Sequence, residues 1–197
     1  MRRFKQNIFI VFVITVCACR SRQTPAEPAT DMTIVKPASD SATNKKELSN
    51  LPASDQINTG ELAPAELVEY SKTLIGIPYL FASTDPAKGF DCSGFITYVF
   101  NHFNIKIPRS SVEFTNQGEE VSIDRAEPGD LLLFTGSDSS IRVVGHMALV
   151  ESRRHDTLFF IHSSSGKANG VVITPFEKYY QGRFVKAIRV FPDKYFE

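Results

Sequence analysis

The chain has 197 residues, of which 42% are hydrophobic and 22% are charged, and these values are normal for a soluble globular protein. The length favours one domain with additional segments. The 22 basic and 22 acidic residues cancel, so the composition indicates no basic surface for binding nucleic acid.

The first 18 residues have the pattern of a secretory signal peptide. Arg2, Arg3 and Lys5 precede the almost wholly apolar stretch 8–16, which is followed by small residues. Nine apolar residues are too few to span a bilayer, which takes about 20. A buried core helix is the alternative, but the basic flank and the position at the start of the chain favour a signal.

The stretch "VCAC" resembles a bacterial lipobox, in which the last cysteine is lipidated and becomes the new N-terminus. We therefore expect lipidation of Cys19, with acyl chains that hold the protein at a membrane surface. The alternative is ordinary signal cleavage that leaves Cys19 as an incidental thiol. If Cys17 leaves with the signal and Cys19 is acylated, Cys92 is the remaining free thiol, in a compartment that favours disulfides. Such a leftover thiol is a candidate for reactivity.

Residues 19–60 are predicted to be a flexible tether that follows the lipidated cysteine. The stretch is rich in Pro, Ala, Ser, Thr and charged residues, and it cannot bury enough apolar surface to offset the entropy of ordering. About 40 such residues give a root-mean-square reach of roughly 35 Å. The segment leaves no room for a separate wall-binding module before residue 61.

The catalytic domain is predicted to cover residues 61–197 and to begin with two helices. Pro64 stands at the predicted first helical position, and Gly76 and Pro78 end that segment. Asp91 is a natural N-cap for the second helix, so Cys92 falls at that helix's N-terminus. The second helix carries an apolar stripe at helical spacing: Phe95, Ile96, Val99, Phe100 and Phe103.

The remainder of the domain is predicted to be mostly strands. "DLLLF", "GHMALVES", "DTLFFIHS", "GVVIT" and "FVKAIRVF" are short apolar or alternating runs separated by polar turns. One short helix is expected near residues 175–180. Helices followed by strands indicate an α+β fold, with N-terminal helices packed on a central antiparallel sheet.

Cys92 has the features of a nucleophile. Unpaired N–H groups and the dipole of a helix N-terminus favour a thiolate, and a nearby imidazole would lower the thiol pKa further. The same N–H groups could receive the oxyanion that forms when a carbonyl is attacked. A buried structural cysteine is the competing interpretation.

Two of the four histidines are placed to act with this thiol. His146 begins one predicted strand, and His162 ends the next. If the two strands form a hairpin, both imidazoles lie at the same end of the sheet. One could deprotonate Cys92 while the other orients it. His102 and His155 are interpreted as surface or partly packed residues.

A zinc site is the alternative use of Cys92, His146 and His162, because zinc accepts such ligands and a fourth position could hold water. However, the chain has no short-spaced ligand pair such as CxxC or HExxH. We therefore expect neither a metal nor another cofactor.

The segment 76–191 resembles the NlpC/P60 family of cell-wall endopeptidases, which are papain-like cysteine peptidases. The matching stretches occur in the family's order: GIPY, GFDCSGFITYVF, IPRSS, PGDLLLF, GHMALV and FIHSSS. The resemblance implies a papain-like fold. It also implies that Cys92 is the nucleophile, His146 the base and His162 the orienting third member.

The same resemblance suggests residues that bind substrate. Tyr79 would line the site and help to hold the oxyanion, whereas Asp91 and Ser93 would contact the substrate, including its free amine. Simple packing for Tyr79 and simple helix capping for Asp91 are the alternatives. Arg109 matches the family's "PR[ST]" element, and its role, substrate binding or bracing of the loop, stays open.

The implied substrate is the stem peptide of peptidoglycan, cut at the amide from the γ-carboxyl of D-glutamate to diaminopimelate or lysine. An N-acetylmuramoyl-L-alanine amidase and a non-catalytic wall-binding lipoprotein are the alternatives. The expected location is the bacterial cell envelope, anchored to a membrane, and in a Gram-negative organism the outer membrane facing the periplasm. An unidentified regulatory or adaptor protein is a further possible partner, and no nucleic acid is expected.

Overall fold

The structure, a computed structural model, describes residues 56–196 of the chain. The predicted signal peptide, Cys19 and nearly all of the predicted tether lie outside these residues. The helices are α1 (Pro64–Lys72), α2 (Cys92–His102) and α3 (Lys178–Arg183), with short 3-10 turns η3 (Ser111–Asn116), η4 (Ile123–Arg125) and η5 (Asp193–Tyr195). The strands are β1 (Thr84–Asp85), β2 (Gly89–Phe90), β3 (Glu119–Val121), β4 (Leu131–Thr135), β5 (Val144–Arg154), β6 (Thr157–Ser164), β7 (Gly170–Pro175) and β8 (Phe184–Arg189).

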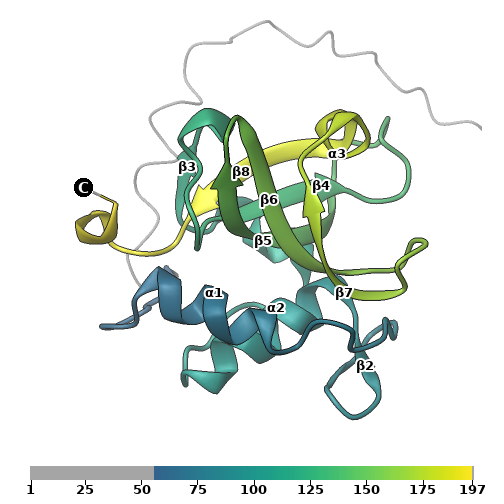
Figure 1. Cartoon of the computed structure of the whole chain (residues 1–197), viewed down its shortest axis with the longest axis horizontal. Helices are drawn as coiled ribbons and strands as arrows, with labels where there is room; N and C mark the ends of the chain where they lie inside the picture. The colour runs from purple at the N-terminus through teal and green to yellow at the C-terminus, as the bar shows by residue number, and fades with distance from the viewer. Residues whose placement is uncertain (1–55, 197) are drawn as a thin grey trace, which may run out of the picture. The chain divides into compact units, whose positions relative to one another are not determined.

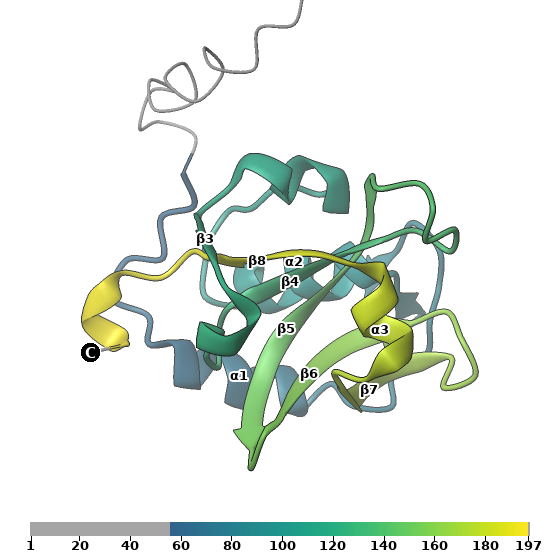
Figure 2. The same ribbon diagram turned by 90° about the horizontal axis from the view of Figure 1, so that it is seen from above.

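Six of the strands form one antiparallel sheet in the order β3-β8-β4-β5-β6-β7. Helices α1 and α2 lie together on one side of this sheet, and α3 lies on the other (Figures 1 and 2). The α+β fold with N-terminal helices on an antiparallel sheet is therefore confirmed. The short third helix begins at Lys178 and not near residue 175, because β7 continues to Pro175.

The core has two parts, one on each face of the sheet. The larger part packs the apolar stripe of α2 against alternate residues of the strands, such as Leu131, Met147 and Ile161. The smaller part, on the opposite face, gathers side chains that include Phe134 and Phe160. Because successive residues of a strand point to opposite faces, buried strands on this sheet contribute to both parts.

Helix α2 begins where the sequence predicts. The Asp91 side chain accepts a hydrogen bond from the Gly94 N–H at 2.6 Å, which satisfies one of the unpaired donors of the first turn. Gly94 also lets the helix approach its neighbour closely, since a Cβ there would lie 2.1 Å from the carbonyl oxygen of Ser83. These contacts fix the first turn, and Cys92 with it.

Helix α1 is shorter than the sequence suggests. It starts at Pro64, and the Glu66 carboxylate accepts a hydrogen bond from the Ala63 N–H at 3.2 Å. It ends at Lys72, and the Thr73 hydroxyl donates to the Tyr70 carbonyl at 2.7 Å. Within residues 56–196, no helix combines the length and the apolar character needed to cross a membrane.

Candidate active site

Cys92 lies where the sheet opens between β5 and β6. The pairing of these strands runs from Arg154↔Thr157 to Leu149↔Ile161 and is not continued toward the start of β5. The backbone of Val150 forms hydrogen bonds with Gly129 and Asp130, which precede β4. The peptide groups of the alternate residues 149, 147 and 145 therefore point the other way, toward β6. The first residue of α2 meets these groups, and the Cys92 Sγ lies 4.0 Å from the Gly145 carbonyl oxygen.

The two predicted histidines are in direct contact. Strands β5 and β6 form the antiparallel hairpin, and the register places both rings on the same face of the sheet. The Nε2 of His146 lies 2.8 Å from the Nδ1 of His162. His146 lies between Gly145 and Met147, whose backbone groups contact the thiol.

Two residues that sequence reasoning missed complete this arrangement. The Nε2 of His162 lies 3.0 Å from the Thr174 hydroxyl and 3.5 Å from the Tyr180 hydroxyl. Thr174 comes from β7 and Tyr180 from α3. Neither belongs to a motif, and only the pairing of β7 with β6 and the packing of α3 on the sheet bring them to the buried ring of His162.

Burial keeps both imidazoles neutral. It lowers the pKa of His146 well below the ordinary value, and the nearby His162 and Arg183 lower it further. It also lowers the pKa of His162 to about 3, with Arg183 as the second cause. At neutral pH, both rings are therefore uncharged. Each ring can donate one hydrogen bond and accept one.

The thiol pKa differs from the expectation. Burial raises the pKa of Cys92 and the negative charge of Asp91 raises it further, whereas the N–H groups of Ser93, Met147 and Cys92 itself act in the opposite direction. The helix N-terminus thus contributes as predicted, but burial outweighs it. The resting state that follows is a neutral thiol and a neutral His146 ring, and not a preformed thiolate.

Asp91, Ser93 and Arg109 form one hydrogen-bonded group beside the thiol. Arg109 donates to both carboxylate oxygens of Asp91, at 3.1 and 2.5 Å, and to the Ser93 hydroxyl at 2.9 Å. Asp91 raises the pKa of Arg109, and only 7% of Asp91 is exposed. Arg109 therefore braces the two residues that flank Cys92, a contact that the sequence left open.

A cavity of about 410 Å³ opens over this group. Tyr79 lines it together with Cys92, Asp91, Ser93 and Arg109. Burial raises the pKa of Tyr79, and the charges of Cys92 and Asp91 raise it further. The structure thus brings the three predicted substrate contacts to the same cavity as the thiol.

A second cavity, of about 500 Å³, lies on the imidazole side. His146, Thr174 and Tyr180 line it, together with the cations Lys167 and Arg183. The two cavities border the same stretch of β5, one with Gly145 in its wall and the other with His146. Cys92 lines the first cavity and His146 lines the second.

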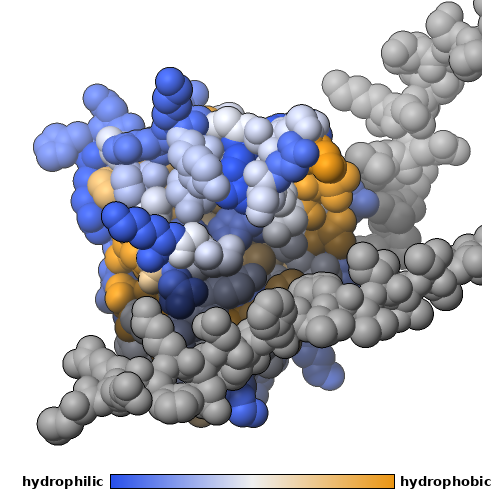
Figure 3. All heavy atoms as spheres, turned by 90° about the vertical axis from the view of Figure 1, so that its right-hand side faces the viewer, coloured by the Kyte–Doolittle hydropathy of each residue, from blue (hydrophilic) through white to orange (hydrophobic). Residues whose placement is uncertain are grey.

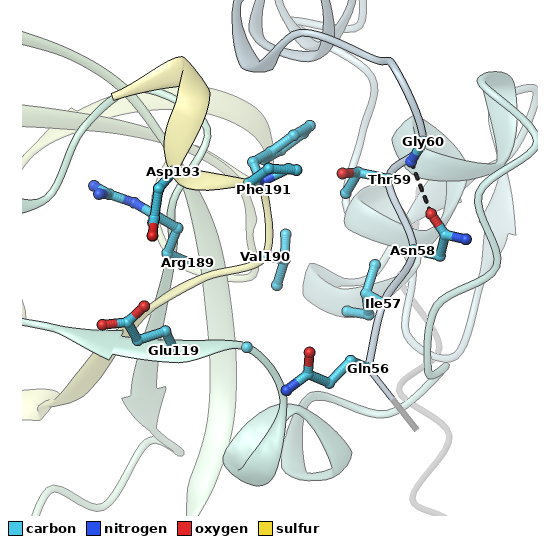
Figure 4. A pocket seen from close by; sticks show the side chains of 12 residues that line it. Gln56, Ile57, Asn58, Thr59, Gly60, Glu119, Arg189, Val190, Phe191 and Asp193 are labelled. Atoms are coloured by element: carbon cyan, nitrogen blue, oxygen red, sulfur yellow. Dashed lines mark hydrogen bonds between the residues drawn. The ribbon is translucent and has the colours of Figure 1, made fainter. Parts of the chain in front are cut away.

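A further cavity, of about 620 Å³, contains none of the predicted site residues. It lies between the segment 56–60 and the residues after β8 (Figure 4), where the Gly60 N–H donates to the Asn58 side chain at 2.9 Å. Across residues 56–196, no cluster of three His, Cys, Asp or Glu side chains could hold a metal ion.

Comparisons with known proteins agree on one family. The sequence profile of the NlpC/P60 family matches residues 76–189, which is more than half of the chain. The gamma-DL-glutamyl hydrolase of Bacillus subtilis is 34% identical over 129 residues, which cover 64% of this chain and 30% of that protein. The murein DD-endopeptidase/murein LD-carboxypeptidase MepS of Escherichia coli is 32% identical over 105 residues, which cover 52% of this chain and 50% of that protein.

A solved structure shows the same fold. The crystal structure of an NlpC/P60 family protein from Bacillus cereus superposes with a TM-score of 0.59 and 29% identity, covering 68% of this chain and 42% of that one. The predicted papain-like fold is thereby confirmed. The matched region spans half or less of each of these three proteins.

Proposed function

Because the chain belongs to the NlpC/P60 family, we propose that it is a cysteine peptidase that hydrolyses the stem peptide of peptidoglycan. The scissile bond in this proposal is the amide from the γ-carboxyl of D-glutamate to diaminopimelate or lysine. The observation that carries the proposal is the hydrogen-bonded pair of His146 and His162 at the stretch of β5 that borders the Cys92 thiol. The name of the Bacillus subtilis relative supports a γ-glutamyl bond, and the name of the Escherichia coli relative supports murein as the material.

In this mechanism the histidine pair sets the direction of proton transfer. If the Nε2–H of His146 donates to the Nδ1 of His162, then the Nε2 of His162 carries a proton and donates to the Thr174 hydroxyl. This tautomer leaves the Nδ1 of His146 free to accept the thiol proton. The opposite tautomer would place a proton on that nitrogen, so the mechanism requires the first one, in which the Thr174 hydroxyl accepts from His162.

The reaction then follows in two stages. His146 accepts the thiol proton as Cys92 attacks the amide carbonyl, and N–H groups at the start of α2, with Tyr79, stabilise the oxyanion. The tetrahedral intermediate collapses to a thioester while His146 gives its proton to the leaving amine. Water, deprotonated by His146, hydrolyses the thioester and restores the thiol. No cofactor takes part in this mechanism.

The acyl side of the substrate is assigned to the cavity at Cys92. Asp91 and Ser93 line that cavity and offer a carboxylate and a hydroxyl to a free amine of the stem peptide. Arg109 holds both groups in place and offsets the charge of Asp91. A stem peptide that keeps its N-terminal amine is therefore the expected substrate.

The location follows from the N-terminal sequence. We assign lipidation to Cys19, which would hold the enzyme at a membrane of the cell envelope, with residues up to 60 as a tether. In a Gram-negative organism the membrane would be the outer one. Cys19→Ser is expected to move the protein from the membrane fraction to the soluble fraction, and unchanged fractionation would contradict the anchor.

The test of the reaction is to treat purified muropeptides and defined stem peptides with the full chain and to measure the product masses. The proposal expects free L-alanyl-D-glutamate, and none with Cys92→Ala. Release of the sugar's lactyl carboxyl would identify an N-acetylmuramoyl-L-alanine amidase instead. Equal product profiles from the wild type and Cys92→Ala would identify a non-catalytic wall-binding protein.

A further inference from the structure

The cavity on the imidazole side differs in charge from the cavity at the thiol. Two cations, Lys167 and Arg183, line it with three serines, two tyrosines and the ring of His146, and no Asp or Glu is among its lining residues. The cavity at Cys92 contains the carboxylate of Asp91, which Arg109 balances. The two cavities therefore differ in the charge of their lining residues.

The chemistry of the reaction decides which part of the substrate meets the cationic cavity. The leaving amine must receive its proton from His146, so it has to lie against that ring. The cavity that His146 lines is then the space for the residue that carries the leaving amine. This step rests on the proposed function, in which that residue is the third residue of the stem.

Arg183 is held rigidly at the wall of this cavity. Its Nη2 donates to the Thr135 carbonyl at 2.8 Å, and its Nη1 donates to the Tyr179 hydroxyl at 2.8 Å. These bonds use two of its five N–H groups, and the Nε has no hydrogen-bond partner among the described residues. Arg183 lines the same cavity as His146, and its charge lowers the pKa of both imidazoles.

Lys167 lies in the turn between β6 and β7 and lines the same cavity. It is exposed, and it makes no ion pair among the described residues. The turn, β7 and α3 all lie toward the right-hand side of Figure 1. Figure 3 views the molecule from that side, and the middle of this face is hydrophilic or intermediate, with hydrophobic patches toward its edges.

We propose that this cavity binds the leaving side of the scissile amide and, through Lys167 and Arg183, selects a third stem residue that bears a side-chain carboxylate. Diaminopimelate has such a carboxylate next to its side-chain amine. Lysine has the amine alone, and two cations in the cavity disfavour it. The enzyme is thus specific for the diaminopimelate type of stem.

The test compares three tripeptide stems that differ only at the third residue: diaminopimelate, diaminopimelate with its side-chain carboxyl amidated, and lysine. For the full chain, kcat/KM is expected to be at least about tenfold higher for the free carboxylate than for its amide, which corresponds to about 1.4 kcal/mol. The amide is nearly isosteric, so this comparison isolates the charge.

Variants then assign the preference to the two cations. Lys167→Gln and Arg183→Gln are each expected to lower the ratio between carboxylate and amide at least threefold, whereas Arg183→Lys keeps most of it. Lys178→Gln is the matched control, because Lys178 is an exposed cation of the same helix that does not line the cavity. It is expected to leave the ratio unchanged.

The same stems are also measured for binding to Cys92→Ala, which separates recognition from turnover. Cleavage at the expected bond with equal kcat/KM for all three stems would overturn the selectivity and leave the proposed function standing. A ratio that Lys167→Gln and Arg183→Gln do not change would also overturn it. Tenfold tighter binding of the carboxylate stem without cleavage by the wild type would support the subsite and refute the proposed reaction.

Discussion

At the scale of single residues, the site is organised by burial as much as by charge. Burial raises the pKa of the Cys92 thiol and lowers the pKa of the His146 imidazole. Both shifts favour the state in which the proton stays on sulfur. In the proposed mechanism the thiolate therefore forms only as the substrate carbonyl is attacked, with the proton moving to His146 at that moment.

This arrangement makes a prediction for pH. Activity requires a neutral His146 and a protonated Cys92, and it is lost in acid only when His146 takes up a proton. Because the His146 pKa lies well below 6.5 and the Cys92 pKa lies above 9, kcat/KM is expected to stay level between these values. The measurement is kcat/KM against pH with a soluble stem peptide.

Two results would contradict the resting state in which both His146 and Cys92 are neutral. One is an acid limb at or above pH 6.5, which would mean that His146 is not shifted downward. The other is iodoacetamide labelling of Cys92 whose rate already levels off near neutral pH, because alkylation follows the thiolate fraction.

At the scale of an element, the first turn of α2 is the part that positions the nucleophile. Asp91 caps it, and Gly94 packs it against the backbone of Ser83. The glycine is required here by close approach, since a Cβ would meet the Ser83 carbonyl oxygen at 2.1 Å. The motif "DCSG" is therefore understood as a cap, a nucleophile, a polar neighbour and a contact point.

Gly94→Ala is expected to displace this turn. Overpacking of this kind costs about 1–3 kcal/mol of stability, and kcat/KM is expected to fall because Cys92 moves with the turn. Urea unfolding followed by circular dichroism and steady-state kinetics measure the two effects. Gly182→Ala is the control, since a Cβ there meets nothing within 4 Å. Wild-type kinetics for Gly94→Ala would show that the close approach does not position Cys92.

At the scale of the whole molecule, one buried ion pair ties the end of β8 to the start of β4. Arg189 donates to both carboxylate oxygens of Asp130, at 2.9 and 2.8 Å. Asp130 is fully buried and Arg189 is 9% exposed. The pair joins two neighbouring strands of the sheet that carries the histidines.

Arg189→Met is expected to lower the free energy of unfolding by about 3–5 kcal/mol, because it leaves the Asp130 charge buried without a partner. Chemical unfolding followed by circular dichroism measures this change. Lys186→Met is the matched control on β8. The Lys186 Nζ lies 3.6 Å from the carboxylate of Glu120, which is largely exposed, so the free energy of unfolding is expected to fall by less than about 1 kcal/mol. Similar losses for both variants would show that the buried pair has no special role.

Much of the fold could be predicted because the signals were local. The apolar stripe of α2 follows helical spacing, Asp91 stands at its cap, and the runs at β5 and β6 are separated by a polar turn. The pairing of His146 with His162 followed from hairpin geometry. The end of α1 was misjudged because it depends on a hydroxyl contact of Thr73 and not on the glycine and proline further along.

What could not be predicted depends on long-range contacts. Thr174 and Tyr180 reach His162 through a strand pairing and a helix packing that no motif signals. The raised pKa of Cys92 depends on how much of the folded chain covers the thiol. The role of Arg109 needed the structure too, because its partners Asp91 and Ser93 are 18 and 16 residues away.

The most direct test of the central claim is to trap the thioester. The full chain is mixed with the diaminopimelate tripeptide stem, quenched in acid, digested and analysed by mass spectrometry. We expect a mass increase equal to one L-alanyl-D-glutamyl group on the peptide that contains Cys92, and no such adduct with His146→Ala. An adduct on another residue, or unchanged turnover by Cys92→Ala, would contradict the account.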